Sequence, residues 1–402
     1  MNNKTESKKA IIIGCGVAGP ALAIMLKRIG IESEIYEAVD CLSDFGILSL
    51  TSNAIRMLKI LEMYDQVKTD DTEGAFFYKQ DGKLFLTFDV RDELKKHGNE
   101  TGFIIRRSQL LQALYQKAIS ENIPIHFGKK LVDIKESNGD ITALFEDGTK
   151  IKGNFLVGCD GTFSKTRNII LPDSPSPKYT GTVWIGANAG DSIEYELQHN
   201  AFHMTFGKKA YFGSAIFSDK KTIWWTNYPC SEKQLKEEFD SVSEKQWTEK
   251  LLEIHKDDPN IISDLIRSAD NEYVKIPLYD IPHLPVWHTD SVCLIGDAAH
   301  ATSPYAGQGA AMALEDVVVL TKCIRDISNL SDAFTKFEEL RKDRVEQIVK
   351  MSLQNGELMK ASNPIKKMFR DKMLSAILNK SIVAKLDWLF SYKVDWDEKI
   401  KL

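Results

Sequence analysis

The chain has 402 residues, of which 43% are hydrophobic and 27% charged, and its 52 basic and 57 acidic side chains give a formal net charge of −5. This ordinary globular composition excludes collagen-like, low-complexity and fully disordered chains, and the slight excess of acid argues against a dedicated nucleic-acid binder. The length suggests two or three domains, each large enough to bury a core.

The N-terminal segment predicts the opening of a βαβ unit. Residues 10–13 form an apolar strand, residues 14–19 a glycine-rich turn, residues 20–29 a helix and residues 34–36 a second strand. Residues 10–26 carry no charge, but this stretch is short for a membrane span, contains Gly and Pro, and lacks a signal-peptide cleavage site. We therefore expect a buried strand followed by a buried helix.

The elements that follow alternate between strands and helices. In chain order they are an aromatic hairpin (76–86), a helix (107–118), short strands (123–158), an aromatic β-rich block (178–229) and helical segments (231–268 and 331 onward). This interleaving predicts an α/β fold with a discontinuous Rossmann-like cofactor domain, an interleaved β-rich substrate domain and a C-terminal helical segment. The expected cofactor domain comprises residues 1–74, 100–177 and 284–330, the substrate domain 75–99 and 178–283, and the C-terminal helices 331–402.

A G-x-G-x-x-G motif, formed by Gly14, Gly16 and Gly19, lies between the first strand and the helix. The first glycine permits the tight turn, the second lets the backbone approach a pyrophosphate, and the third lets helix and strand pack closely. The phosphates then lie at the helix N-terminus. Glu37 ends the second strand, where an acid accepts hydrogen bonds from ribose hydroxyls and repels a 2′-phosphate. The motif therefore predicts FAD or NAD rather than NADP.

Two later strands end in acidic motifs. Residues 156–159 precede Asp160-Gly161, and residues 292–295 precede Gly296-Asp297. Each motif places a carboxylate at the carboxyl edge of a sheet, where ligands of α/β folds bind. A loop and a further helix follow, and the N–H groups of that helix favour negative charge at the same edge.

In this order the three motifs, which span residues 11–320, resemble those of the single-component FAD-dependent aromatic hydroxylases with the p-hydroxybenzoate-hydroxylase fold. The resemblance implies that Arg107 contacts the flavin, Asp297 the ribityl chain and the Leu131 backbone the adenine, and that Pro304 lies near flavin C4a. The FAD-binding residues that it implies are Gly14, Gly16, Val17, Ala18, Gly19, Glu37, Ala38, Arg107, Leu131, Asp160, Gly161, Asp297, Gly307, Gln308, Gly309 and Ala310.

The activity that the resemblance implies is that of an NAD(P)H-dependent flavoprotein monooxygenase. In this family NADH or NADPH reduces FAD, O₂ adds at flavin C4a, and the hydroperoxide hydroxylates a small aromatic or heteroaromatic substrate. Because the chain has no second G-x-G-x-x-G, we expect the nicotinamide to bind transiently, with Asp160 and Arg167 as candidate neighbours. The alternatives are a flavin-dependent reductase or oxidase, a halogenase-like enzyme of the same fold, and a non-catalytic flavin-binding protein.

The β-rich block is expected to supply the substrate wall. Its aromatic residues, among them Trp224 and Trp225, alternate so as to line both faces of a sheet, and most should be core. Lys209 lies in a turn where some related hydroxylases carry a basic substrate contact. We predict it as a substrate contact, with a solvated turn lysine as the alternative.

The remaining histidine pairs, the basic C-terminal segment and the cysteines are not expected to take part in the reaction. The pairs His199/His203 and His283/His288 lack a third ligand, so no metal is predicted. Residues 363–385 are basic and partly apolar, but packing on the cofactor domain explains them better than membrane contact. Six cysteines without a Cys-x-x-Cys pair indicate reduced thiols in a cytoplasmic protein. No obligate protein partner and no general base is evident.

Overall fold

A parallel sheet forms the centre of one half of the molecule, which we call the cofactor-binding half after the prediction made from the sequence. The computed structural model describes residues 8–42, 45–88, 91–96, 98–137, 140–190, 197–237, 239–269, 272–281, 283–359 and 381–400. The sheet order is β17-β11-β1-β2-β7, and every pairing in it is parallel. Its strands are β1 (Lys9–Ile13), β2 (Glu32–Tyr36), β7 (Ile125–His126), β11 (Phe155–Gly158) and β17 (Val292–Leu294).

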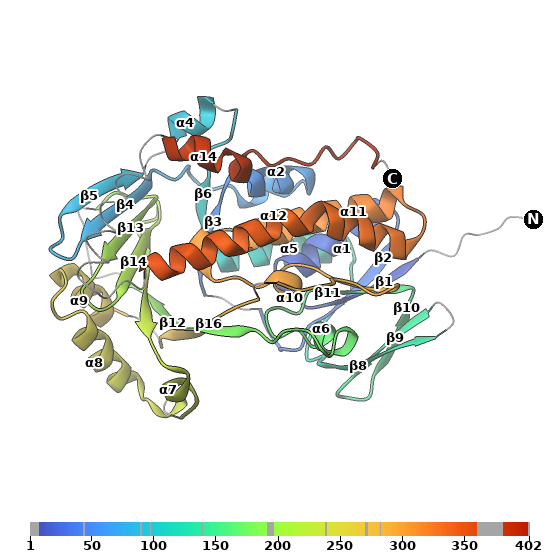
Figure 1. The fold of residues 1–402 in the computed structure, drawn as a ribbon, viewed down its shortest axis with the longest axis horizontal. Helices are drawn as coiled ribbons and strands as arrows, with labels where there is room; N and C mark the ends of the chain where they lie inside the picture. The colour runs from blue at the N-terminus through green and yellow to red at the C-terminus, as the bar shows by residue number, and fades with distance from the viewer. Residues whose placement is uncertain are drawn as a thin grey trace, which may run out of the picture.

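Apolar helices cover this sheet. Helix α1 (Ala18–Arg28) and helix α11 (Gly309–Asp326) are buried along almost their whole lengths, which matches their nearly continuous apolar sequences. They share one core with the parallel sheet, helix α2 (Ser52–Ile60), helix α5 (Arg107–Ser120) and helix α12 (Leu330–Met359). Figure 1 shows α11 and α12 running diagonally across this part of the molecule.

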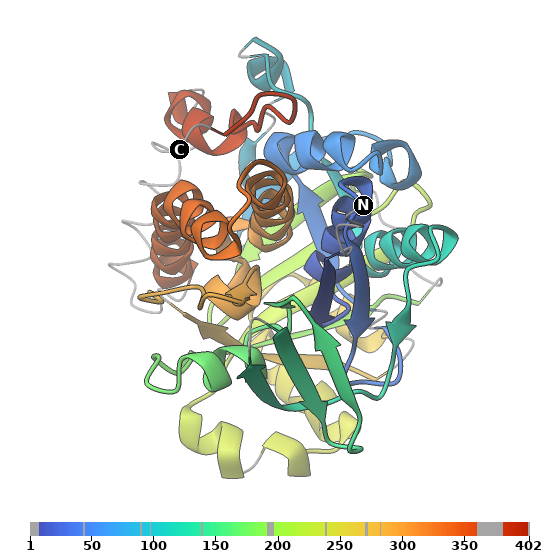
Figure 2. The same cartoon turned by 90° about the vertical axis from the view of Figure 1, so that its right-hand side faces the viewer.

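Smaller elements flank the parallel sheet. The antiparallel sheet of β8 (Leu131–Ser137), β9 (Asp140–Phe145) and β10 (Lys150–Gly153) packs beside it, and β3 (Ile47–Leu50) pairs with β6 (Phe103–Arg106). Figure 2 shows the parallel sheet and the β8–β10 sheet side by side. The short helices are α3 (Tyr64–Val67), α4 (Arg91–Lys96), α6 (Lys165–Ile170), α10 (Asp297–His300) and the 3₁₀ turn η2 (Pro304–Ala306).

A second, larger sheet makes up the β-rich half. Its order is β16-β12-β15-β14-β13-β4-β5, and the pairing of β13 with β4 is parallel while its neighbours are antiparallel. Its strands are β4 (Gly74–Lys79), β5 (Leu84–Phe88), β12 (Lys178–Asn188), β13 (Ala201–Phe206), β14 (Tyr211–Ile216), β15 (Thr222–Pro229) and β16 (Val274–Asp280). The early hairpin and the later block therefore share one sheet. The division of the chain into domains stays a prediction.

The two faces of the larger sheet have different neighbours. Trp224 faces helices α8 (Glu244–Ile254) and α9 (Asn260–Arg267), which lie outside the sheet in Figure 1 together with α7 (Glu232–Glu237) and the 3₁₀ turn η1 (Phe239–Ser241). Trp225 lies on the opposite face, in one cluster with Phe45 and Ile104 beside the cofactor-binding half. The predicted alternation of aromatic residues is confirmed.

The α/β fold predicted from the sequence is confirmed, including its helical C-terminal segment. After α12 the chain includes α14 (Ser381–Phe390), which packs near α2, and then residues 391–400. Most of the basic segment 363–385 lies outside the described residues. Within the part of the chain that the structure describes, no helix is long and apolar enough to cross a membrane.

Candidate active site

The three sequence motifs meet at the carboxyl edge of the parallel sheet. Backbone hydrogen bonds join the turns that carry them: Gly14 N–H donates to Tyr36 O at 2.8 Å, and Cys159 N–H donates to Ile13 O at 2.7 Å. Ile295 N–H donates to Gly158 O at 3.1 Å, which ties the third turn to the second. Segments far apart in sequence thus form one edge, which is where ligands of such sheets bind.

The glycines of the first motif have different roles. Gly14 has φ +105°, and a Cβ there would lie 2.4 Å from Cys159 O; a Cβ on Gly19 would lie 2.0 Å from Gly14 O. Both positions need glycine because backbone atoms approach so closely. A Cβ on Gly16 would meet no described atom within 4 Å. Gly16 therefore borders open space in front of α1, whose N-cap, Val17, contributes no side-chain cap. That space suits a pyrophosphate.

Glu37 lies beside the same turn. Its Oε2 accepts a hydrogen bond from Cys15 N–H at 2.6 Å and its Oε1 accepts one from Val39 N–H at 3.1 Å, so the carboxylate is fixed in place. Lys129 N–H donates to Glu37 O at 2.7 Å, which brings the start of β8 alongside. Leu131 begins β8 and is buried, whereas Ala38 is exposed. The predicted ribose-binding and adenine-contacting positions are therefore neighbours.

Arg107 and Asp297 lie near each other at the far end of this edge. Burial lowers the pKa of the Arg107 guanidinium, and the charge of Asp297 opposes that shift. Asp297 keeps exposed area, and desolvation raises the pKa of its carboxyl against the charges of His300 and Arg107. Gly296, with φ +58°, turns the chain so that Asp297 begins α10. This arrangement offers a cation and an acid to the polar edge of one ligand.

Hydrogen bonds within the protein organise the Asp160-Gly161 turn, and its contact with a nicotinamide stays a prediction. Asp160 accepts hydrogen bonds from Ser164 Oγ at 2.6 Å and from Thr166 N–H at 2.9 Å, so its carboxylate closes the turn before α6. Arg167 is 1% exposed and donates to Ala298 O and Thr162 O, both at 2.8 Å. These contacts join the second motif to α10, and they leave the Arg167 guanidinium within the protein. Gly161 has φ +76° and borders open space.

The loop before α11 combines an exposed turn, residues 304–307, with the buried side chain of Gln308. Pro304 and Gly307 are exposed, and Gly307 adopts a left-handed conformation with φ +62°. Gln308 is 1% exposed; its side chain donates to Thr51 Oγ1 at 3.1 Å and accepts from Asn53 Nδ2 at 2.9 Å. The Gln308 side chain therefore points into the protein and fixes the loop, and only its backbone remains for a ligand. Gly309 and Ala310 open α11, with half-buried N-terminal residues.

A buried ionic network supports this loop, and the sequence interpretation missed it. Arg341 binds Glu315 at 2.6 Å and Asp316 at 2.8 Å, and all three side chains have no exposed area. Asp316 also accepts hydrogen bonds from Gly296 N–H at 2.9 Å and from His300 Nε2 at 2.6 Å. The available signal was the pair of adjacent acids within the apolar run 310–320 of α11, because buried charges need partners.

The network keeps its acids ionised. Desolvation would raise the pKa of both Glu315 and Asp316, but the arginine charges and, for Asp316, the His300 charge outweigh it, so both pKa values lie below their usual range. Asn53 donates to Glu315 Oε1 at 2.8 Å as well as to Gln308. Carboxylates thus hold the backbone of Gly296 and, through Asn53, the side chain of Gln308.

The structure does not bring Lys209 to this site. Lys209 lies in the exposed turn before β14 and pairs with Glu253 of α8 at 3.3 Å. The opposite end of β14 is the one near the cofactor-binding half, where Asp219 binds Arg106 at 3.0 Å. Six residues of strand separate the two ends, about 20 Å at about 3.3 Å per residue. This position fits the alternative of a solvated turn lysine, and the substrate contact of Lys209 stays a prediction.

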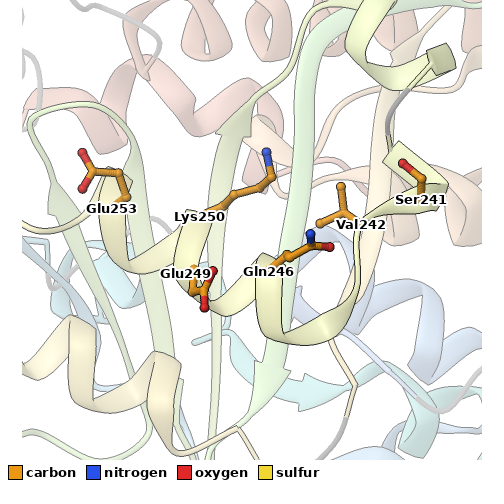
Figure 3. Close-up of a pocket in the computed structure, with 6 residues that line it drawn as sticks. All are labelled: Ser241, Val242, Gln246, Glu249, Lys250 and Glu253. Carbon is orange, nitrogen blue, oxygen red and sulfur yellow. The ribbon is translucent and has the colours of Figure 1, made fainter.

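A surface hollow beside α8 lies apart from the motifs. Figure 3 shows the six side chains that line it, Ser241, Val242, Gln246, Glu249, Lys250 and Glu253. None of them belongs to a predicted site, and α8 covers the face of the larger sheet that is turned away from the flavin motifs. Across the described ranges, no group of three His, Cys, Asp or Glu side chains is placed to hold a metal.

The fold and the site together define a dinucleotide-binding flavoprotein. A family model described as "FAD binding domain" matches residues 7–352. The chain belongs to this family, and the predicted relationship to the FAD-dependent aromatic hydroxylases is confirmed.

Relatives and solved structures resemble most of the chain. It is 25% identical over 376 residues to 6-hydroxynicotinate 3-monooxygenase of Bordetella bronchiseptica, which covers 88% of this chain and 92% of that protein. It is 26% identical over 370 residues to a chloroplastic zeaxanthin epoxidase of Oryza sativa subsp. japonica, spanning 88% of this chain but only 54% of that protein. The structure of Klebsiella pneumoniae HpxO complexed with FAD and uric acid superposes with a TM-score of 0.84 at 23% identity, covering 96% of this chain and 97% of the other.

Proposed function

We propose that this protein is an FAD-dependent monooxygenase that uses NADH or NADPH and O₂ to hydroxylate a small aromatic or heteroaromatic compound. One observation carries the proposal: the open turn at Gly16, the fixed carboxylate of Glu37 and the Arg107–Asp297 pair converge at one sheet edge. The hydroxynicotinate monooxygenase among the relatives and the structure containing uric acid support the substrate class.

FAD fits the residues present. The pyrophosphate would occupy the space beside Gly16, where N–H groups at the start of α1 favour negative charge. Glu37 would accept hydrogen bonds from the ribose hydroxyls, because two backbone N–H groups already orient its carboxylate. Arg107 and Asp297 would hold the flavin end, with Pro304 and the start of α11 beside the ring.

The substrate would lie between the flavin and the aromatic face of the larger sheet. That face presents Trp184 and Trp225, with ring centroids 6.1 Å apart, and it packs with Phe45 and with Tyr305 of the Pro304 loop. Flat apolar side chains of this kind match an aromatic ring and exclude water from it.

When bound, FAD supplies the redox chemistry, in which one oxygen atom of O₂ enters the substrate and the other leaves as water while NAD(P)H is oxidised. The protein contributes binding, orientation and exclusion of water. Arg107 and the N-terminus of α11 would stabilise negative charge at the polar edge of the reduced ring, an effect of about 0.3–1 kcal/mol for an exposed helix end and up to about 2 kcal/mol when partly buried.

The test follows the cofactor and the product separately. The purified protein, reconstituted with FAD, should be yellow, and its NAD(P)H oxidation at 340 nm should accelerate with one member of a panel of phenolic acids, hydroxypyridines and purines. With ¹⁸O₂, one labelled oxygen should appear in that compound. Oxidation of NAD(P)H without a labelled product would favour the reductase or oxidase alternative, and bound FAD that NAD(P)H cannot bleach would favour a non-catalytic protein.

A further inference from the structure

The C-terminal residues form a strap, residues 386–400, across the cofactor-binding half. Figure 1 shows this segment running from α14 past α2 toward the end of α11. Two arginines hold its first part: Arg344 donates to Trp388 O at 2.8 Å and to Leu389 O at 2.9 Å, and Arg56 of α2 donates to Phe390 O at 2.5 Å. These carbonyls end α14, where cations are favourable partners for unpaired acceptors.

An aromatic ring of the strap lies on the buried ionic network. Tyr392 lies under Arg344, with the guanidinium carbon 4.1 Å from the ring centroid, and under Arg341 at 5.3 Å. Both distances are within the range of cation–π attraction. The same arginines bind Glu315 and Asp316, with Arg344 Nη2 2.9 Å from Glu315 Oε1. The strap therefore covers the cations that neutralise the two buried acids.

The acids connect these cations to the flavin turns. Asp316 accepts the Gly296 N–H that sets the turn before Asp297, and Glu315 accepts a hydrogen bond from Asn53, which also holds Gln308. A continuous series of contacts thus begins with the cation–π contacts of Tyr392 and continues through ion pairs and hydrogen bonds to both segments that flank the proposed flavin site. A buried charge that loses its partner is costly, so the geometry of the acids depends on how firmly the arginines are held.

From this series of contacts we propose that Tyr392 and the first part of the strap, residues 386–392, are positioning elements for FAD, which fix Arg341 and Arg344 and through them the Gly296–Asp297 turn and the Gln308 loop. The inference rests on the proposed FAD site. The ring of Tyr392 lies on Arg344 and Arg341, so its effect on FAD would pass through these arginines. Its loss should loosen the flavin turns while leaving the folded chain intact.

The strap itself supplies a matched control. Trp396 is also half-buried and also lies on two arginines, 4.5 Å from Arg325 and 5.5 Å from Arg28. Arg325 pairs with Asp326 at 2.7 Å. Trp396 therefore resembles Tyr392 in burial and chemistry, but the pairs it covers lie outside the network that holds the flavin turns.

The experiment titrates FAD into apoprotein and follows flavin fluorescence, visible circular dichroism of bound FAD, and the thermal midpoint of the apoprotein. Tyr392→Ala should raise the Kd for FAD by about tenfold, the size of a partly desolvated cation–π contact, and should alter the flavin dichroism. Tyr392→Phe keeps the ring and should bind FAD as the wild type does. Trp396→Ala should lower the thermal midpoint without changing Kd.

Two results would overturn the inference. One is an unchanged Kd in a folded Tyr392→Ala protein, and the other is an equal loss of FAD affinity in Tyr392→Ala and Trp396→Ala, which would indicate general destabilisation. Tyr392→Leu provides the same test if the alanine variant does not fold, because it keeps apolar packing but lacks the π-face. Failure of the wild-type protein to bind FAD would instead refute the proposed function.

Discussion

Substitution of Gly16 separates cofactor binding from folding more sharply than any other change in the first motif. A Cβ on Gly16 would meet no described atom within 4 Å, so Gly16→Ala adds no clash. A Gly-to-Ala change at a position whose backbone conformation suits alanine stabilises a protein by about 0.4–1 kcal/mol, because it lowers the conformational entropy of the unfolded chain. The apoprotein should therefore unfold at the same temperature as the wild type or slightly higher.

The same methyl group would occupy the space assigned to the pyrophosphate. Loss of one hydrogen bond between backbone and phosphate, about 1.5–3 kcal/mol for a charged partner, would weaken FAD binding roughly 10- to 150-fold. Fluorescence titration of apoprotein with FAD measures this loss, and differential scanning fluorimetry measures the stability.

Gly19→Ala is the matched control. Its Cβ would lie 2.0 Å from Gly14 O, so α1 or the turn must move. Overpacking of this kind costs about 1–3 kcal/mol, and the thermal midpoint of the apoprotein should fall. If Gly16→Ala binds FAD as tightly as the wild type, the pyrophosphate does not lie at this turn and the proposed FAD site is wrong.

Three further results are expected. Arg341→Met, which leaves Glu315 and Asp316 buried without their common partner, should lower the free energy of unfolding by about 3–5 kcal/mol in urea denaturation, and a loss below about 1 kcal/mol would contradict the burial of the network. Burial raises the pKa of the Cys15 thiol to about 12, so mass spectrometry should show slow alkylation of Cys15 at pH 8 and rapid alkylation of the exposed Cys41. Because the thiol of the unfolded chain ionises at lower pH than the thiol of the folded chain, Cys15 should lower the free energy of unfolding as the pH rises from about 9 to 12. Lys209→Ala should leave the substrate KM unchanged in steady-state assays, and a marked rise in KM would show that the turn before β14 reaches the substrate.

The sequence was most informative where a constraint is local. The glycine at 19 follows from close backbone contact with Gly14 within one turn, and the alternation of Trp224 and Trp225 follows from the two-residue period of a strand. These features need no knowledge of distant partners. They were sufficient to predict the α/β fold and the position of Glu37 beside the glycine turn.

Features that depend on residues far away in the chain could not be predicted from the sequence. Glu315 meets Arg341 from 26 residues away and Asn53 from 262 residues away, and no local pattern encodes either distance. The position of Lys209 depends on distant elements as well, because the resemblance in chain order suggested a substrate contact and only the orientation of β14 shows where its turn lies. The buried side chain of Gln308 likewise depends on α2, which precedes it by most of the chain.

The parallel pairing of β4 with β13 also constrains the order in which the protein can fold during its synthesis. Strand β4 (Gly74–Lys79) cannot pair with β13 until Ala201–Phe206 has left the ribosome. At about 5–20 residues per second, this delay is roughly 6–25 s. During that time the hairpin with β5 exposes an unpaired edge that carries aromatic residues, which invites association with other chains. Co-expression of chaperones, which cover exposed edges of unfinished chains, should therefore raise the yield of native protein more than changes made to the mature surface.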